Sequence, residues 1–243
     1  MYNSASCSDE NEIAKENHKV KFRQLASEIA ALGTKFEISI VPYRNFELLH
    51  FSKLNLDIQS KILQSLQVYF NIYSSTLAEG SLPSDAARII WNALAELGFK
   101  PTSDVFSYIE DGNIIEIHDD SFVQIFRSIN FFKFCSYSLE ELYCHQMTDL
   151  YERDLQLESN LMGLVAKLYR GEIKATTMTG LKAHIIQEKK SESKLRVKAL
   201  IKYIAPLYSR SSTYLIPIAT LVIETADFSS ESFKVHSENF AEI

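Results

Sequence analysis

The first part of the chain carries apolar residues at the spacing of one helix face. The pattern predicts a single long helix from residue 12 to residue 33. Its apolar stripe consists of Phe22, Leu25, Ile29 and Leu32. A stripe of this kind has to be covered, and we expect Phe22, Leu25 and Ile29 to form a homodimer interface.

Two further helices are predicted before residue 100. One covers about residues 57–79, and the next starts with Ser84 as its N-cap and ends at Gly98. Between the first two helices, residues 36–41 alternate apolar and polar side chains. That alternation predicts a short strand or an extended connector.

After residue 100 the pattern changes to that of strands. Residues 105–108 and 114–117 are predicted to form a hairpin across the Asp111-Gly112-Asn113 turn. The apolar stretch 122–134 is predicted to begin as a helix.

After residue 134 the residue pattern predicts helices followed by antiparallel strands. Ser138 and Glu141 have the spacing of a capping box. An amphipathic helix is predicted over residues 149–169. Three strands, at 175–188, 195–208 and 214–225, are joined by short polar links, which favours antiparallel hairpins.

Five segments in this order resemble the PAS family of sensory domains: residues 111–117, 121–122, 125–126, 137–142 (Tyr-Ser-Leu-Glu-Glu-Leu) and 168–172. The resemblance covers roughly residues 103–227. It implies an α+β fold in which an N-terminal helical region precedes a PAS-like domain with a curved antiparallel sheet. We expect a disordered tail at 1–11, a helical region at 12–100, the PAS-like domain at 101–228 and a C-terminal tail at 229–243.

The resemblance also implies where a ligand would bind. In PAS-like domains the small helices cover the inner face of the sheet, and a cofactor sits between them. The side chains expected to line that space are Phe132, Phe134, Tyr137, Leu142, Met147 and Leu164. His145 is the candidate ligand of a haem iron. The alternative is that the aromatic side chains simply fill the core, so the cofactor stays unknown, with haem or another small ligand left open.

Charge is distributed unevenly along the sequence. Residues 165–210 contain eleven basic and three acidic side chains, although the whole chain has a formal net charge of −6. The basic patch is expected at Lys189, Lys190, Lys194, Arg196 and Lys198. It predicts contact with nucleic acid or an acidic partner, and a solvated sheet edge is the alternative.

Composition and motifs limit the classes of protein to which this chain can belong. The three cysteines form no Cys-x-x-Cys pair, and no apolar run approaches the roughly 20 residues of a membrane span. The sparse cysteines are typical of a cytoplasmic protein. The sequence has no Gly-x-Ser-x-Gly or His-Glu-x-x-His motif and no phosphate-binding glycine loop, so we expect a protein that is not an enzyme. The expected function is sensory, acting in signal transduction or transcription regulation through a regulatory protein partner. The alternatives are a DNA-binding regulator that uses the N-terminal helices or the basic 165–210 face, and an unrecognised enzyme.

Overall fold

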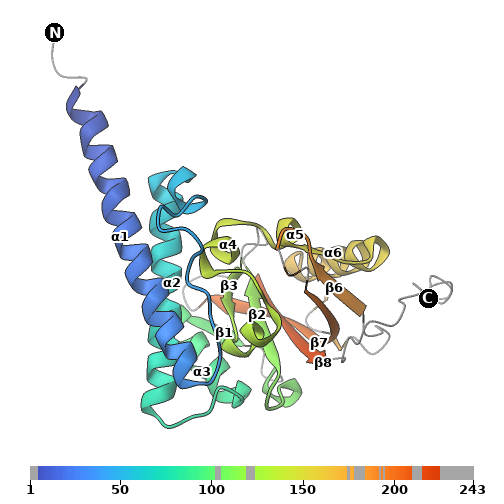
Figure 1. Ribbon diagram of the computed structural model, residues 1–243. Helices are drawn as coiled ribbons and strands as arrows, with labels where there is room; N and C mark the ends of the chain where they lie inside the picture. The colour runs from blue at the N-terminus through green and yellow to red at the C-terminus, as the bar shows by residue number, and fades with distance from the viewer. Residues whose placement is uncertain are drawn as a thin grey trace.

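The protein is a mixed α+β protein built on one antiparallel sheet (Figure 1). The computed structural model describes residues 5–101, 105–118, 124–173, 176–177, 184–191, 193, 195–209 and 215–224. The α+β class and the antiparallel sheet predicted from the sequence are confirmed.

Three helices form the N-terminal region: α1 (Ala5–Lys35), α2 (Leu56–Ala78) and α3 (Ala86–Leu97). Helix α1 runs beside α2, and its first turns extend beyond it (Figure 1). Because α1 already begins at Ala5, a helix replaces most of the tail expected at residues 1–11. The N-cap of α3 is Asp85 rather than Ser84, since the Asp85 carboxylate accepts from the backbone N–H of Arg88.

The three residues expected at a dimer interface lie inside the chain instead. Phe22 and Ile29 have no exposed surface, and Leu25 is 1% exposed. The ring of Phe22 packs 4.7 Å, centroid to centroid, from that of Phe51. The apolar stripe of α1 is therefore covered by the rest of this chain, which corrects the expectation of a dimer through these side chains.

A long connector joins α1 to α2. It has no strand at residues 36–41, so the extended connector is the alternative that the structure adopts. It contains one 3₁₀ turn, η1 (Phe51–Lys53), before the Asn55 side chain caps α2. Several of its backbone groups bond to residues almost a hundred positions further along the chain, as described below.

Within the described residues the sheet contains eight strands: β1 (Phe99–Pro101), β2 (Ile114–His118), β3 (Gln124–Arg127), β4 (Tyr151–Glu152), β5 (Thr176–Thr177), β6 (His184–Glu188), β7 (Arg196–Ser209) and β8 (Leu215–Glu224). Its main order is β3-β2-β8-β7-β6-β4, with β1 and β5 also paired to β7. The strands predicted at 195–208 and 214–225 are confirmed as β7 and β8. Strand β2 therefore pairs with β8, although about a hundred residues separate the two strands in sequence.

The predicted hairpin at residues 105–117 is wrong in its first half. Residues Val105–Tyr108 form a 3₁₀ turn, η2, and the ring of Tyr108 stacks 4.1 Å from that of Tyr203. The Asn113 side chain accepts from the backbone N–H of Glu110 and closes the turn without a strand before it. The hairpin partner of β2 is β3, which also corrects the helix expected from residue 122.

Between β3 and β5 the chain forms several helical segments: η3 (Ile129–Phe134), α4 (Leu139–Cys144), α5 (Met147–Leu150) and α6 (Leu155–Tyr169). The capping box of Ser138 and Glu141 is confirmed at α4. The single helix predicted over 149–169 is interrupted, because Tyr151 and Glu152 pair with β6 and Asp154 caps a new helix. Of the strand predicted at 175–188, the structure describes β5 and β6 and leaves 178–183 outside the described residues.

One apolar core joins the N-terminal helices to the sheet. It includes side chains from α1, α2 and α3 together with those of β2, β3 and β7. The boundary expected at residues 100–101 falls inside β1, which continues from α3 and pairs with β7.

Candidate functional site: a buried ion pair and the docking of α4

Adjacent residues of β3 face opposite sides of the sheet. The ring of Phe126 packs against Tyr69 and Tyr73 of α2. Since neighbouring side chains alternate along a strand, Arg127 points to the other side, where it contacts Phe131 of η3 and Met147 of α5. Helix α2 thus covers one face at this edge of the sheet, and the short segments η3 and α5 lie over the other.

An ion pair is buried beneath η3 and α5. Nη2 of Arg127 lies 2.5 Å from Oε1 of Glu116, which is the residue opposite it on β2. Both residues are only 3% exposed. The guanidinium also lies 3.6 Å above the ring of Phe131, and Nη2 lies 3.0 Å from Sδ of Met147. The ion pair therefore connects two strands to both covering segments.

The charge state of this pair follows from its surroundings. Burial would raise the pKa of Glu116, but the Arg127 charge and then His118 outweigh burial and lower the pKa to about 2. Glu116 is therefore a carboxylate at neutral pH. Nη1 of Arg127 is buried and has no hydrogen-bond partner among the described residues, so one strong donor here is unused.

Half of the six side chains expected to line a ligand pocket are buried in the core. Phe132, Tyr137 and Leu142 are buried, and Phe134, Met147 and Leu164 are partly buried against the core. Of the six, Met147 contacts the ion pair. Tyr137 has a structural role, because its hydroxyl donates to the carbonyl of Leu150 and accepts from the backbone N–H of Lys190.

Helix α4 holds the connector between α1 and α2 through a buried carboxylate. Oε1 of Glu140 accepts from the backbone N–H of His50 at 2.8 Å and from that of Phe51 at 3.1 Å. Glu140 is 2% exposed. Its charge therefore lies at the first residues of the η1 turn, where free backbone donors favour a negative group.

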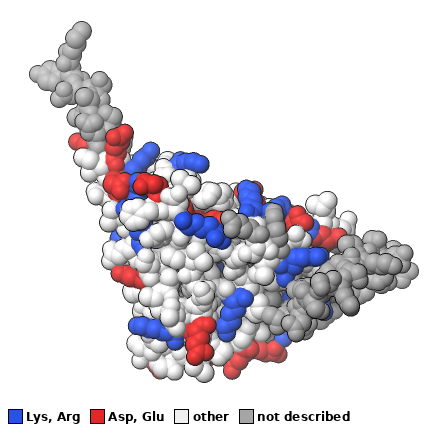
Figure 2. All heavy atoms as spheres, viewed as in Figure 1, with Lys and Arg blue, Asp and Glu red and all other residues white. Residues whose placement is uncertain are grey.

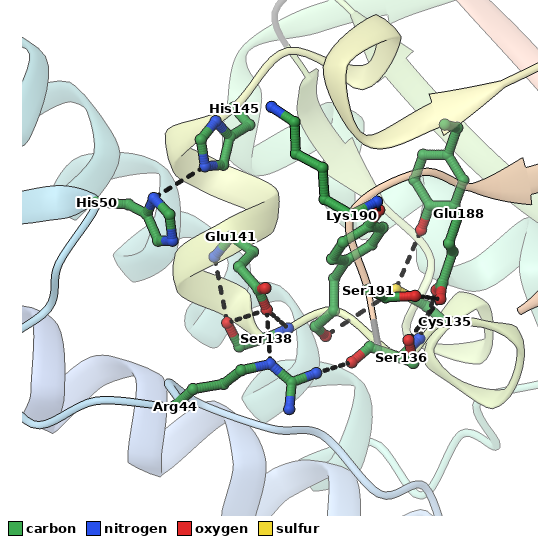
Figure 3. Close-up of polar contacts among 12 residues, drawn as sticks. Arg44, His50, Cys135, Ser136, Ser138, Glu141, His145, Glu188, Lys190 and Ser191 are labelled. Carbon is green, nitrogen blue, oxygen red and sulfur yellow. Dashed lines mark hydrogen bonds and ion pairs between the residues drawn. The ribbon is translucent and has the colours of Figure 1, made fainter. Parts of the chain in front are cut away.

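The start of α4 makes further bonds to the connector. The backbone N–H of Leu139 donates to the carbonyl of Val41. Arg44 reaches both Oε2 of Glu141 at 3.2 Å and the carbonyl of Ser136 at 2.6 Å (Figure 3). The capping-box carboxylate of Glu141 thus also binds the connector. These bonds dock the start of α4 on the connector between α1 and α2, beside the direct packing of the N-terminal helices on the sheet.

A second buried carboxylate fixes the segment before α4 to the end of β6 (Figure 3). Oε1 of Glu188 accepts from the backbone N–H of Ser136 at 2.7 Å, and Oε2 accepts from the Ser136 and Ser191 hydroxyls and from the backbone N–H of Leu195. The Glu188 carboxylate therefore has a structural role, as the shared acceptor of these backbone and hydroxyl donors.

The two described thiols are poor nucleophiles and poor metal ligands at neutral pH. Burial raises the pKa of the Cys135 thiol to about 11, even though Tyr151 hydrogen-bonds to its sulfur. Burial and the neighbouring Glu140 carboxylate raise the pKa of Cys144 further. Neither thiol therefore has an appreciable thiolate fraction.

The candidate haem ligand, His145, faces another histidine rather than the inner face of the sheet. Its Nε2 lies 3.0 Å from Nδ1 of His50 on the connector, and the two ring centroids are 4.6 Å apart (Figure 3). Among the described residues, no group of three or more His, Cys, Asp or Glu side chains could hold a metal ion. The nitrogen that would bind iron is already used between the rings.

The expected basic patch is less exposed than the sequence indicates. Arg196 and Lys198 are half-buried on β7, while Lys189 and Lys190 are exposed after β6. Lys194 lies outside the described residues. On the face shown in Figure 2, Lys and Arg side chains are interspersed with Asp and Glu.

Sequence reasoning missed the residues that organise both regions. Glu116 and Arg127 come together only through the register of β2 and β3. Glu140 stands beside the capping-box residue Glu141, and His50 lies on the connector, far from α4 in sequence. Charged residues inside apolar runs were the available signal, since Glu116 and Arg127 both interrupt buried stretches.

Comparison with known proteins identifies no relative: no protein-family model matches the chain, and no curated protein matches it significantly. No helix in the described part of the chain is long and apolar enough to cross a membrane.

Proposed function

We propose that the chain is a regulatory protein whose second half is a PAS-like sensory or dimerisation domain. The docking of α4 supports this proposal most directly. The capping-box segment that carries the resemblance binds, through Glu140 and Glu141, the connector between the N-terminal helices. A change in the position of α4 would therefore reach those helices directly.

The order of the elements agrees with the same proposal. Two strands, short helices, a longer helix and further antiparallel strands follow one another, and the short segments lie over one face of β2 and β3. The proposed sensing face is the one that carries the Glu116–Arg127 pair. A ligand there would compete for Arg127, which contacts α5 through Met147.

The proposed mechanism is a shift between two packings of the sheet and its covering segments. Movement at Arg127 would pass to α5 through Met147, and to α4 through the chain between them. It would reach the connector through Glu140. A ligand drives such a shift only if it binds one packing more tightly than the other.

The proposal does not include chemistry on a substrate. The hydroxyls of Ser136, Ser138 and Ser191 donate to the carboxylates of Glu188 and Glu141, where they hold segments together. The thiols described above are protonated at neutral pH. These observations favour a regulatory role over catalysis.

Two measurements on the purified full chain test the proposal. Native mass spectrometry with an absorption spectrum would detect a bound molecule, and a Soret or flavin band would identify a coloured one. Light scattering over a range of protein concentrations would detect a dimer. We expect a bound small molecule, a dimer, or both. A monomer of the sequence mass with no bound molecule would overturn the sensory and the dimerisation forms together.

DNA binding is the second candidate, and only the basic residues favour it. Salt-dependent retardation of duplex DNA by the full chain would support it, because binding through Lys and Arg releases counterions. No retardation at low salt would reject it.

A further inference from the structure

Two histidines meet where α4 docks on the connector. His145 is the residue that ends α4, and His50 precedes the η1 turn. Nε2 of His145 and Nδ1 of His50 are 3.0 Å apart, which is hydrogen-bond distance, and the rings meet edge to face. Figure 3 shows the two rings pointing toward each other from the two sides of the docking interface.

This contact depends on the number of protons that the pair holds. With both rings neutral, one nitrogen donates and the other accepts. With one ring charged, a charged donor still meets a neutral acceptor. With both rings charged, both nitrogens carry hydrogens, so the bond is lost and two positive charges face each other.

Charged groups from every neighbouring segment act on the pair. The exposed Lys190, after β6, opposes a positive charge on His145, while Asp149 of α5 and Glu141 of α4 favour it. Arg44 of the connector offsets part of the Glu141 charge, because the two side chains form an ion pair. Glu140 lies close by, since its carboxylate accepts from the backbone N–H of His50. Burial is the largest influence; it acts with His50 and Lys190 to lower the pKa of His145.

We propose that the His50–His145 contact is a proton-operated latch, which holds the connector on α4 until both rings are charged and then releases it. Release would act on the bonds next to the pair, those from the backbone N–H groups of His50 and Phe51 to Glu140. The latch therefore lets acidification change the contact between the N-terminal helices and the sheet. This inference is independent of the PAS-like proposal, because it depends only on the two rings and the docking of α4.

A proton fits this site better than a metal ion. Structural metal sites take about four protein ligands, and the described residues bring together no group of three candidate ligands. The distance between the two nitrogens is that of a direct hydrogen bond. Histidine changes charge between about pH 5 and pH 8, so protons are the ligand that this contact suits.

The first test follows the imidazole nitrogens of the whole protein by NMR during a pH titration. We expect the two imidazoles to take up their protons one after the other, with the pKa of His145 below its ordinary value of 6.5. Two independent titrations at that ordinary value would overturn the proposal. This result needs no variant, so it holds even if a substitution prevents folding.

The second test measures hydrogen exchange of the connector amides at residues 44–53, corrected for the intrinsic effect of pH. Between about pH 7.5 and pH 5, we expect exchange in the wild-type chain to rise roughly tenfold relative to α2. In His145→Gln, which cannot become charged, the rise should stay below about twofold. The control is His118→Gln, because His118 lies on β2 beside Glu116, whereas His18 is linked to the connector through Gln59, which donates to the Phe51 carbonyl. An equal rise in wild type and His145→Gln would overturn the latch, as would its loss in His118→Gln.

Discussion

Arg127 Nη2 lies 2.5 Å from Glu116 Oε1 at a place where neither side chain reaches solvent. The pair links β2 to β3, and Arg127 continues the contact to η3 and α5. A buried charge that loses its partner costs far more than an exposed one, because water cannot replace the lost contact. Substituting one residue of the pair should therefore lower the free energy of unfolding far more than substituting both.

Replacing Arg127 with Met should lower the free energy of unfolding by about 3–5 kcal/mol, since Glu116 would remain charged and buried. The double substitution Arg127→Met with Glu116→Leu should recover most of that loss, because the carboxylate that lost its partner is removed as well. Urea denaturation of the two single variants and the double variant would measure this cycle.

The exposed pair Lys202–Glu110 supplies the control. Lys202→Met should cost less than about 1 kcal/mol, as is usual for exposed pairs. If Arg127→Met costs no more than Lys202→Met, the pair is not buried in solution, and the packing described for η3 and α5 is wrong.

The pKa of Glu116 also predicts the response of the fold to acid. The pKa is about 2 in the folded chain and 4.5 as the ordinary value, so the unfolded chain binds the proton more readily. The resulting stabilisation is present in full above about pH 4.5, is lost as the pH falls toward 2, and amounts to about 3 kcal/mol. Unfolding free energies measured at intervals between pH 6 and pH 2.5 should show this loss in the wild type. In Glu116→Gln the same interval should show a smaller slope, and equal slopes would contradict the assignment.

The regular elements were largely readable from the sequence. The long helix α2, strands β7 and β8, and the capping box of Ser138 and Glu141 each have a pattern confined to neighbouring residues. The strand predicted at residues 105–108 is wrong for a tertiary reason. An apolar segment next to a turn has the local pattern of a strand, but here it forms a 3₁₀ turn. The ring of Tyr108 stacks on that of Tyr203, and the spacing of residues in the sequence does not report this contact.

The candidate site could not be read in the same way. Pairing of Glu116 with Arg127 requires the register of two strands, which includes a shift between Ile117 and His118. The contacts of α4 join residues about ninety positions apart, such as Glu140 and His50. Local patterns predict that Glu140 belongs to a helix start, but only the folded chain shows which backbone groups it binds.

Two tyrosines of α2 provide a matched test of the packing against β3. The hydroxyl of Tyr73 accepts from the buried backbone N–H of Ile129 at 2.6 Å, whereas that of Tyr69 neighbours the Tyr73 hydroxyl without a well-formed hydrogen bond among the described residues. Tyr73→Phe should therefore cost about 1–3 kcal/mol, because it leaves a buried donor unsatisfied. Tyr69→Phe should change the free energy of unfolding by less than about 0.5 kcal/mol or raise it. Chemical denaturation of both variants tests this order, and a reversed order would place α2 differently on the sheet.

Gly33 and Gly163 provide a matched test of packing, because a side chain would be crowded at the first and free at the second. A Cβ at Gly33 would lie 2.8 Å from the Ile38 carbonyl oxygen and 2.8 Å from Cδ1 of Ile40, while one at Gly163 would meet nothing within 4 Å. Gly33→Ala should lower the free energy of unfolding by about 1–3 kcal/mol, because the connector has to move away from α1. Gly163→Ala, in the exposed part of α6, should raise it by about 0.5–1 kcal/mol through better helix propensity. Thermal unfolding of both variants gives the signs directly, and a neutral Gly33→Ala would show that the connector does not lie against α1.

The docking of α4 predicts different effects for two neighbouring glutamates. Glu140→Ala removes the buried acceptor of two backbone N–H groups and should cost about 3 kcal/mol, with faster hydrogen exchange at His50 and Phe51. Glu141→Ala removes the capping-box partner and the Arg44 contact, which are partly exposed, and should cost about 1 kcal/mol. Urea denaturation gives the two energies, and exchange at the connector locates the effect. If the two substitutions cost the same and leave exchange at residues 50–51 unchanged, α4 does not hold the connector, and the proposed path from the sheet to the N-terminal helices fails with it.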